Sequence, residues 1–196
     1  MVGGKTQVLV IDHSGRGHAT ADLFVRTNGD VVVHYVPGCA AIAHERIRTQ
    51  PAVTMESPHD LLRYAREEAI DLVYVSNPVP VAAGFVDAFQ AAGFRVVGPD
   101  RRAARIESSK VEAKQLFERY DIPSPEHVSF DDVEAARNYV RACPHQVVVK
   151  ADGMSAGNGA YVCDDERDAL TAIDELMVKR VFGEAGDRIV VERRYY

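Results

Sequence analysis

Short apolar runs alternate with segments of helical spacing through the first hundred residues, and this alternation restricts the fold more than any other feature. The β-branched runs at 7–11, 31–36, 72–75 and 94–97 predict strands. The segments between them predict helices at 19–26, 58–70 and 81–92. Strand–helix–strand repeats join parallel strands through right-handed crossovers. We therefore expect an α/β fold whose first domain, 1–100, is a doubly wound parallel sheet with helices on both faces.

The turn after the first strand is a candidate ligand site. Ligands bind at the carboxyl ends of the strands in such sheets. Arg16 and His18 lie there, at the start of the first helix, where the helix dipole favours an anion. Two interpretations stay open: a phosphate-type ligand, or two solvent-exposed side chains. Gly15 and Gly17 do not complete a G-x-G-x-x-G motif, which argues against a Rossmann oxidoreductase.

The second half has a different pattern. Two short helices are predicted at 101–106 and 109–120, and they form a linker, 101–121, that ends before a stiff Ile-Pro-Ser-Pro connector. Strands at 126–130, 147–150, 160–163 and 188–192 and helices at 131–142 and 165–181 then predict a small α+β lid domain, 122–196.

A glycine-rich loop joins the strands at 147–150 and 160–163. Gly153, Gly157 and Gly159 allow turns and close approach of bare backbone to a ligand, and Lys150 ends the preceding strand. Several N–H donors and one mobile cation suit a polyphosphate. An ordinary hairpin turn with a solvated lysine is the alternative. The loop is not a P-loop, because no Gly-Lys-Ser/Thr follows.

Composition excludes several classes of protein. The 196 residues are 46% hydrophobic and 27% charged with a net charge of −6, so we expect a globular protein without a nucleic-acid surface. No apolar run approaches the ~18 residues of a membrane span. The three cysteines form no C-x-x-C, which predicts buried, reduced thiols in a cytoplasmic protein. Asp152, Asp164 and Asp165 are interpreted as loop and cap residues rather than metal ligands.

Five motifs in order resemble those of the glycinamide ribonucleotide synthetase (phosphoribosylamine–glycine ligase) family of the ATP-grasp superfamily. They are Val8–Ile11 with Gly15-Arg16 and His18-Ala19; Tyr35-Val36-Pro37-Gly38; Gly98-Pro99 with Ala103-Ala104 and Glu107–Lys110; Lys150–Gly153 with Ala156-Gly157 and Gly159; and Phe182–Gly186 with Val190–Glu192. The resemblance implies a pre-ATP-grasp domain followed by the ATP-grasp lid. It covers about the first half of that enzyme.

The resemblance also implies roles. Lys110 and Lys150 would contact ATP phosphates or the adenine edge, and Glu192 would begin the adenine hinge. The residues expected to cover the β- and γ-phosphates are Gly153, Ser155, Gly157, Asn158 and Gly159. Those expected on the phosphoribosylamine side are Gly15, Arg16, His18 and Gly38. The implied reaction of purine biosynthesis joins glycine to phosphoribosylamine through an acyl phosphate, with ATP and Mg²⁺. The Mg²⁺ ligands are expected in the missing half, and no catalytic residue is assigned.

Departures from the family motifs leave alternatives. Asp12 and Ser14 stand at glycine positions, Gly17 at a glutamate and Asn158 at the loop lysine. An unpaired Asp12 would repel a substrate phosphate. Three interpretations therefore stay open. The chain is a part of the ligase that is inactive by itself, or it belongs to a divergent ATP-grasp ligase with another substrate. The third is a non-catalytic module that binds a nucleotide or pairs with another subunit. An open edge at 188–192 predicts pairing with a second copy or with a partner chain that supplies the missing half.

Overall fold

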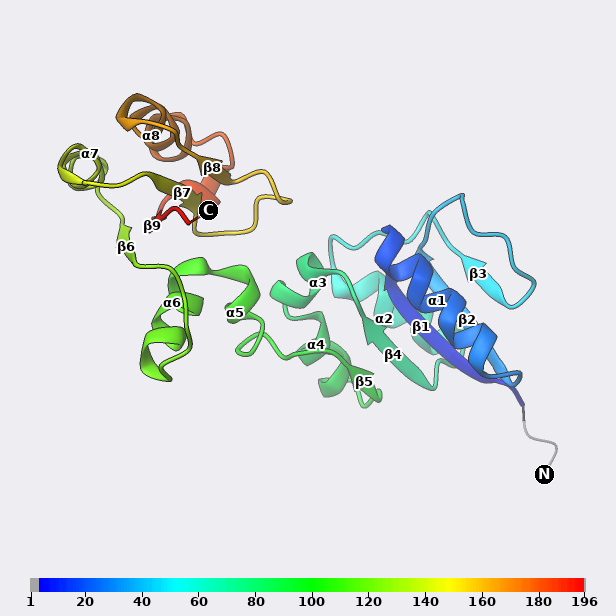
Figure 1. Cartoon of the computed structure of the whole chain (residues 1–196). Helices are drawn as coiled ribbons and strands as arrows, with labels where there is room; N and C mark the ends of the chain where they lie inside the picture. The colour runs from blue at the N-terminus through cyan, green and yellow to red at the C-terminus, as the bar shows by residue number, and fades with distance from the viewer. Residues whose placement is uncertain (1–3, 196) are drawn as a thin grey trace. The chain divides into compact units, whose positions relative to one another are not determined.

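The structure is a computed structural model that describes residues 4–195, and the chain divides into two units, Met1–Ala104 and Arg105–Tyr196. Each unit has its own sheet (Figure 1). Each also has its own hydrophobic core. Within the described residues, no helix is both long and apolar enough to cross a membrane.

The first unit is a parallel sheet with the strand order β3-β2-β1-β4-β5. Its strands are β1 (Thr6–Asp12), β2 (Val31–Pro37), β3 (Ile47–Thr49), β4 (Leu72–Val75) and β5 (Val96–Val97). Its helices are α1 (Gly15–Thr27), α2 (Pro58–Glu67), α3 (Pro78–Ala82) and α4 (Phe85–Ala91). The order reverses beside β1, which makes the carboxyl ends of β1 and β4 the switch point where such sheets bind ligands.

Alternate residues of β1 enter two different cores. Val8 and Val10 pack with α1, whereas Leu9 and Ile11 pack with the buried residues of α2 and α4. A strand buried on both faces reads as a continuous apolar run. The predicted doubly wound parallel sheet is confirmed.

Three local predictions in this unit are wrong. The strand β3 was not expected, and α1 begins at Gly15, inside the expected turn. The single helix expected over 81–92 is two helices, because Gly84 between them has a left-handed backbone with φ of 83°. A Cβ at that glycine would meet the Arg101 guanidinium at 2.8 Å.

The second unit is an antiparallel sheet with the order β6-β9-β7-β8. Its strands are β6 (His127–Phe130), β7 (Val147–Ala151), β8 (Ala160–Val162) and β9 (Ile189–Arg193). Its helical segments are α5 (Arg105–Ser108), α6 (Lys110–Arg119), α7 (Val133–Ala142), α8 (Glu166–Ile173), the π-helical turn η1 (Asp174–Val178) and the 3₁₀ turn η2 (Gly183–Gly186).

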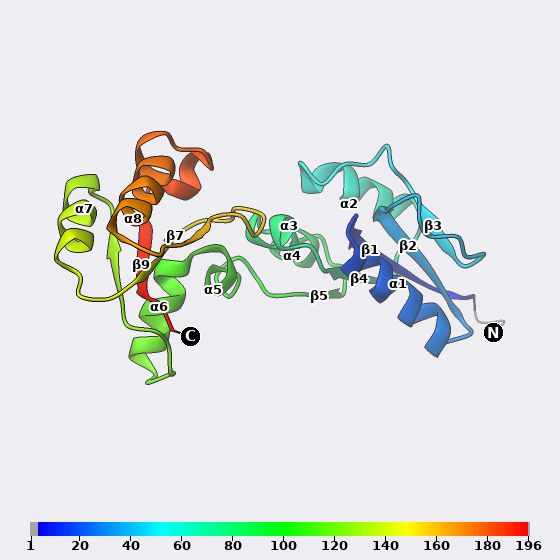
Figure 2. The same cartoon turned by 45° about the horizontal axis from the view of Figure 1, so that its top comes forward.

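The two faces of this sheet differ. The helices α7 and α8 lie side by side (Figures 1 and 2) and pack on the face that carries Val149, Ile189 and Val191. Because side chains alternate along a strand, Lys150 and Glu192 point to the opposite face. That face receives a side chain from α6, as described below.

The expected open edge at 188–192 is wrong. The strand β9 is hydrogen-bonded to β6 on one side and to β7 on the other, so β6 and β8 are the edges. The helix expected over 165–181 runs without a break over 166–178, but its last part, η1, is π-helical and it ends three residues early. Gly186 of η2 packs so closely on this π turn that a Cβ would lie 2.2 Å from the Leu176 carbonyl oxygen. The first linker helix spans Arg105–Ser108 rather than 101–106.

Candidate functional site

Two lysines converge on one buried glutamate in the second unit. The Glu192 side chain on β9 is buried, and its Oε2 lies 2.5 Å from Lys150 Nζ on β7. Its Oε1 lies 2.9 Å from Lys114 Nζ on α6. Lys114 Nζ also contacts Ser124 Oγ at 2.5 Å. The cluster therefore joins β9, β7 and α6 on the sheet face opposite α7 and α8.

Charge in this cluster is fixed by the pairing. Burial alone would raise the pKa of Glu192, but hydrogen bonds from Lys150 and Lys114 outweigh it and hold the pKa below its usual value. The carboxylate is thus charged at neutral pH. Burial lowers the pKa of nearby Lys110, opposed chiefly by the charge of Asp152, and Lys110 Nζ donates to the Gly153 carbonyl at 3.3 Å.

The glycine-rich loop is closed at its base and open at its tip. Ser155 accepts two hydrogen bonds, from Gly159 N–H to Oγ at 3.0 Å and from Asn158 N–H to its carbonyl at 2.9 Å. Gly157 has a left-handed φ of 84°. In the described part of the chain, the N–H groups of residues 154–157 have no recorded hydrogen-bond acceptor. These consecutive donors are available to an anion.

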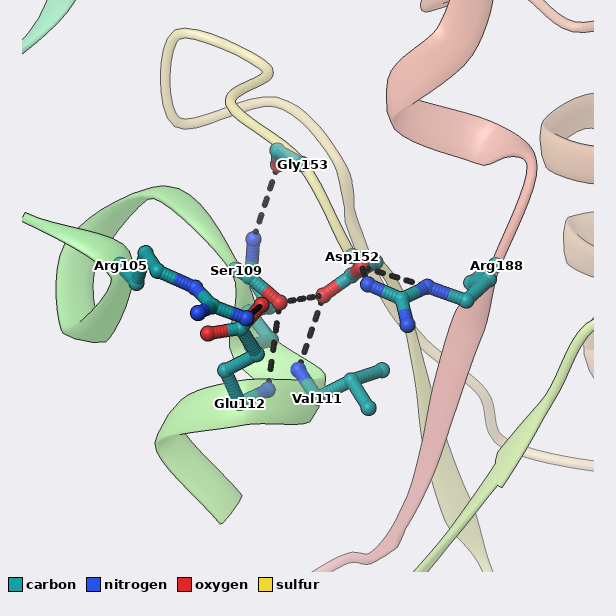
Figure 3. Close-up of polar contacts among 8 residues, drawn as sticks. Arg105, Ser109, Val111, Glu112, Asp152, Gly153 and Arg188 are labelled. Atoms are coloured by element: carbon teal, nitrogen blue, oxygen red, sulfur yellow. Dashed lines mark hydrogen bonds and ion pairs between the residues drawn. The ribbon is translucent and has the colours of Figure 1, made fainter. Parts of the chain in front are cut away.

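Asp152 fastens the loop to the start of α6 (Figure 3). Its Oδ1 accepts from Val111 N–H and from Ser109 Oγ–H, both at 2.8 Å, and so caps α6 from a different element. Its Oδ2 accepts from two nitrogens of Arg188 at 2.6 and 3.0 Å. The Asp152 carbonyl accepts from Lys110 N–H at 3.0 Å. The carboxylate therefore sets Lys110 beside the loop.

The other two acidic residues singled out in the sequence are also structural. Asp165 caps α8 by accepting from Asp168 N–H at 2.8 Å, and Asp164 pairs with Arg194 at 2.5 Å. Among the described residues, no group of three or more His, Cys, Asp or Glu side chains could hold a metal ion.

Sequence reasoning missed Lys114 and Arg188. Lys114 follows Lys110 by four residues in a predicted helix, which places both on one face. That spacing was the available signal. No sequence signal pointed to Arg188, because its partner Asp152 is 36 residues away along the chain.

The first unit brings its predicted residues to one edge of its sheet. Gly15, Arg16 and His18 occupy the first turn of α1, and Gly38 follows β2 with a left-handed φ of 81°. Gly38 N–H donates to the carbonyl of Asp12 at the end of β1, at 3.1 Å. Arg16 is exposed and His18 half-buried, and neither side chain has a recorded partner among residues 4–195.

Asp12 is fully buried and paired. Its Oδ1 accepts from the N–H groups of His13 and Ser14 at 2.7 and 2.8 Å and from Asn77 at 3.2 Å, and its Oδ2 accepts from Ser76 at 2.7 Å. Burial would raise the pKa of Asp12, but these hydrogen bonds, led by that of Ser76, lower it.

Gly17 lies directly against this carboxylate. A Cβ at Gly17 would come 2.4 Å from Asp12 Cβ, so a larger residue at 17 is incompatible with this arrangement. Asp12 and Gly17, which both differ from the family motif, therefore pack against each other and depend on each other.

A parallel sheet unit, followed by an antiparallel unit with a glycine-rich loop and lysines around a buried glutamate, defines the first part of an ATP-grasp protein. The chain belongs to the phosphoribosylglycinamide synthetase family. Residues 6–107 match the model of its N domain, and residues 108–195 match that of its ATP-grasp (A) domain.

Curated relatives agree with this assignment. The chain is 39% identical to a phosphoribosylamine–glycine ligase of Archaeoglobus fulgidus, over 96% of this chain and 42% of the relative. It is 38% identical to that of Halalkalibacterium halodurans, over 94% of this chain and 43% of the relative. The chain thus spans less than half the length of these relatives.

The same fold occurs in solved structures of low identity. The ligase from Thermotoga maritima matches with a TM-score of 0.75 at 21% identity, over 97% of this chain and 44% of that one. Biotin carboxylase from Campylobacter jejuni matches with a TM-score of 0.74 at 15% identity, over 97% of this chain and 45% of that one.

Proposed function

We propose that this chain is the N-terminal part of an ATP-dependent ligase that joins glycine to phosphoribosylamine through an acyl phosphate, in cytoplasmic purine biosynthesis. Family membership and the names of the curated relatives support this proposal. The observation that carries it is the convergence of Lys110, Lys114 and Lys150 near Glu192, beside a loop with consecutive unpaired N–H groups.

The residues present fit one side of an ATP site. Lys110 and Lys150 supply cations, and the loop 153–159, including Gly153, Ser155, Gly157, Asn158 and Gly159, supplies N–H donors for the β- and γ-phosphates. Glu192 fixes Lys150 and stands where the chain enters the adenine hinge. The protein's part in such a reaction is to position phosphates and neutralise their charge.

The first unit provides the substrate side in this proposal. Arg16 and His18 at the start of α1, with the bare backbone at Gly15 and Gly38, receive the phosphate of the ribosylamine. The Asp12 carboxylate keeps its negative charge, but it is fully buried and both of its oxygens accept hydrogen bonds inside the protein, so it is not presented to that phosphate.

Mg²⁺ does not fit the residues at hand. No suitable group of ligands occurs among residues 4–195, so we assign no residue to the ion and derive no step through it. We propose that the Mg²⁺ ligands lie in the part of the relatives' sequence that this chain does not cover.

The test is nucleotide binding measured by calorimetry. We expect the chain to bind ATP weakly, and Lys150→Ala to weaken binding at least about tenfold, or about 1.4 kcal/mol. The matched control is Lys179→Ala, which removes an exposed lysine paired with Glu175 outside the cluster. Equal binding by both variants would refute the assigned ATP site.

A non-catalytic nucleotide-binding module is the second candidate. The exposed Asn158, at the loop position where the resemblance implies lysine, favours it because the phosphate clamp has one cation fewer. A longer chain that includes the remaining part distinguishes the two. Ligation of glycine with release of ADP supports the enzyme, whereas ATP binding without ligation supports the module.

A further inference from the structure

A thiol and an imidazole form a close pair at one end of the second unit. Cys143 follows α7, and its Sγ lies 2.8 Å from His145 Nδ1. Both side chains are half-buried and line a pocket of about 240 Å³ formed by the end of α7, the start of β7 and the start of α8. None of the lysines of the nucleotide site, nor Glu192, lines this pocket.

The other two cysteines lack this arrangement. Cys163 is buried, and burial raises the pKa of its thiol to about 11, so it stays a protonated, inert core residue. Cys39 is half-buried without a recorded hydrogen bond to an imidazole in the described chain. The expectation that all three thiols are buried is therefore wrong for Cys39 and Cys143.

The pair has the geometry of an activated nucleophile. A thiol within hydrogen-bond reach of a base can pass its proton to the imidazole and attack as thiolate. The charged and titratable neighbours from the surrounding elements are Tyr139 and Arg141 of α7, and Asp165 and Glu166 at the start of α8.

The pocket beside the pair offers polar groups for a small ligand. Gln146 also lines the pocket, but its amide is already held, because Nε2 donates to the Asp164 carbonyl at 2.7 Å. Exposed Arg141 and Glu166 offer one charge of each sign. The volume is below the ~300 Å³ at which pockets for drug-sized ligands begin, which suits one arm of a short peptide.

We propose that Cys143 is a modification site that forms a mixed disulfide with a small, peptide-like disulfide. The Cys143 thiol gives its proton to His145, and the thiolate attacks one sulfur of the disulfide. A Cys143–S–S–R bond forms, the original S–S bond breaks, and the departing thiolate takes the proton from His145. The disulfide is the oxidant, and one equivalent of free small thiol is released.

The first experiment tests the pair with iodoacetamide on the full chain at neutral pH, with sites mapped by mass spectrometry. Cys143 is expected to react at least about tenfold faster than Cys39, and His145→Gln to abolish that advantage. The control His59→Gln, which changes an exposed histidine of the first unit, leaves the rate unchanged. Equal rates for Cys143 and Cys39, or an unchanged rate in His145→Gln, overturn the proposal.

The second experiment tests the pocket by comparing glutathione disulfide with 2-hydroxyethyl disulfide, which lacks amide and charged groups. Arg141→Gln is expected to slow the mixed disulfide with glutathione several-fold, because it removes the pocket cation that can pair with a carboxylate of that reagent, and to leave the reaction with the neutral reagent unchanged. Equal effects on both reagents would refute recognition of a peptide-like ligand. These readouts require neither ATP nor ligation, so they succeed or fail independently of the proposed function.

Discussion

Replacing Asp152 by alanine is expected to destabilise the second unit by about 3 kcal/mol. The carboxylate is buried and accepts from Ser109 and Val111 at the start of α6. Losing a helix cap costs about 1 kcal/mol, and leaving buried donors without an acceptor costs about 1 kcal/mol or more. The Arg188 pair adds less than about 1 kcal/mol, since the Arg188 side chain is 46% exposed.

The assay is urea unfolding followed by far-UV circular dichroism, together with amide hydrogen exchange over residues 109–120. A loss of about 3 kcal/mol corresponds to a roughly hundredfold loss of exchange protection. The matched control is Asp132→Ala, because Asp132 caps α7 through one exposed bond to Ala135 N–H and should cost only about 1 kcal/mol. Asp152→Ala costing no more than this control would refute the view that one carboxylate holds the loop and α6 together.

Three further outcomes follow from the packing and the charges. Gly17→Ala should lower the free energy of unfolding by about 2 kcal/mol through overpacking against Asp12. Gly15→Ala, with nothing within 4 Å of the added Cβ, should raise it by about 0.5 kcal/mol; calorimetric melting of both variants checks the opposite signs. Glu192→Gln should cost about 3 kcal/mol at neutral pH by leaving the Lys114 ammonium buried without its counter-charge. Because the folded pKa of Glu192 lies below the ordinary 4.5, its stabilisation is present above that pH and is lost as pH falls through the folded pKa. Urea midpoints measured from neutral to acidic pH should therefore converge for wild type and Glu192→Gln, and a constant gap would contradict the assigned pairing.

The first sheet could be predicted because its information is local. An apolar run such as 7–11 predicts that a strand forms and that its two faces are buried. The three-residue strand Ile47–Thr49 has no such run, and the division of the helix at Gly84 depends on a left-handed residue packed against distant Arg101. Local periodicity contains neither fact.

The site shows the same limit. The motifs predict Lys110, Lys150 and Glu192 as site residues, and the structure brings Lys150 and Glu192 into contact. The role of Asp12 could not be derived from its neighbours, because Ser76 and Asn77 lie 64 and 65 residues further along the chain. From the sequence, the Asp12 carboxylate is expected to repel a phosphate. In the fold, its hydrogen bonds join the loop after β1 to the loop after β4.

The central position of β9 also dictates an order of events during biosynthesis. The first sheet has all its strands once Val97 is made, whereas the second lacks its middle strand until Arg193. At the ~5–20 residues per second of translation, the intervening stretch takes roughly 5–20 s. From the completion of β7 at Ala151 until that point, β6 and β7 exist without the strand that joins them. A ribosome that stalls between residues 151 and 189 therefore holds a finished first sheet and a second unit in which β6 and β7 each lack their partner strand.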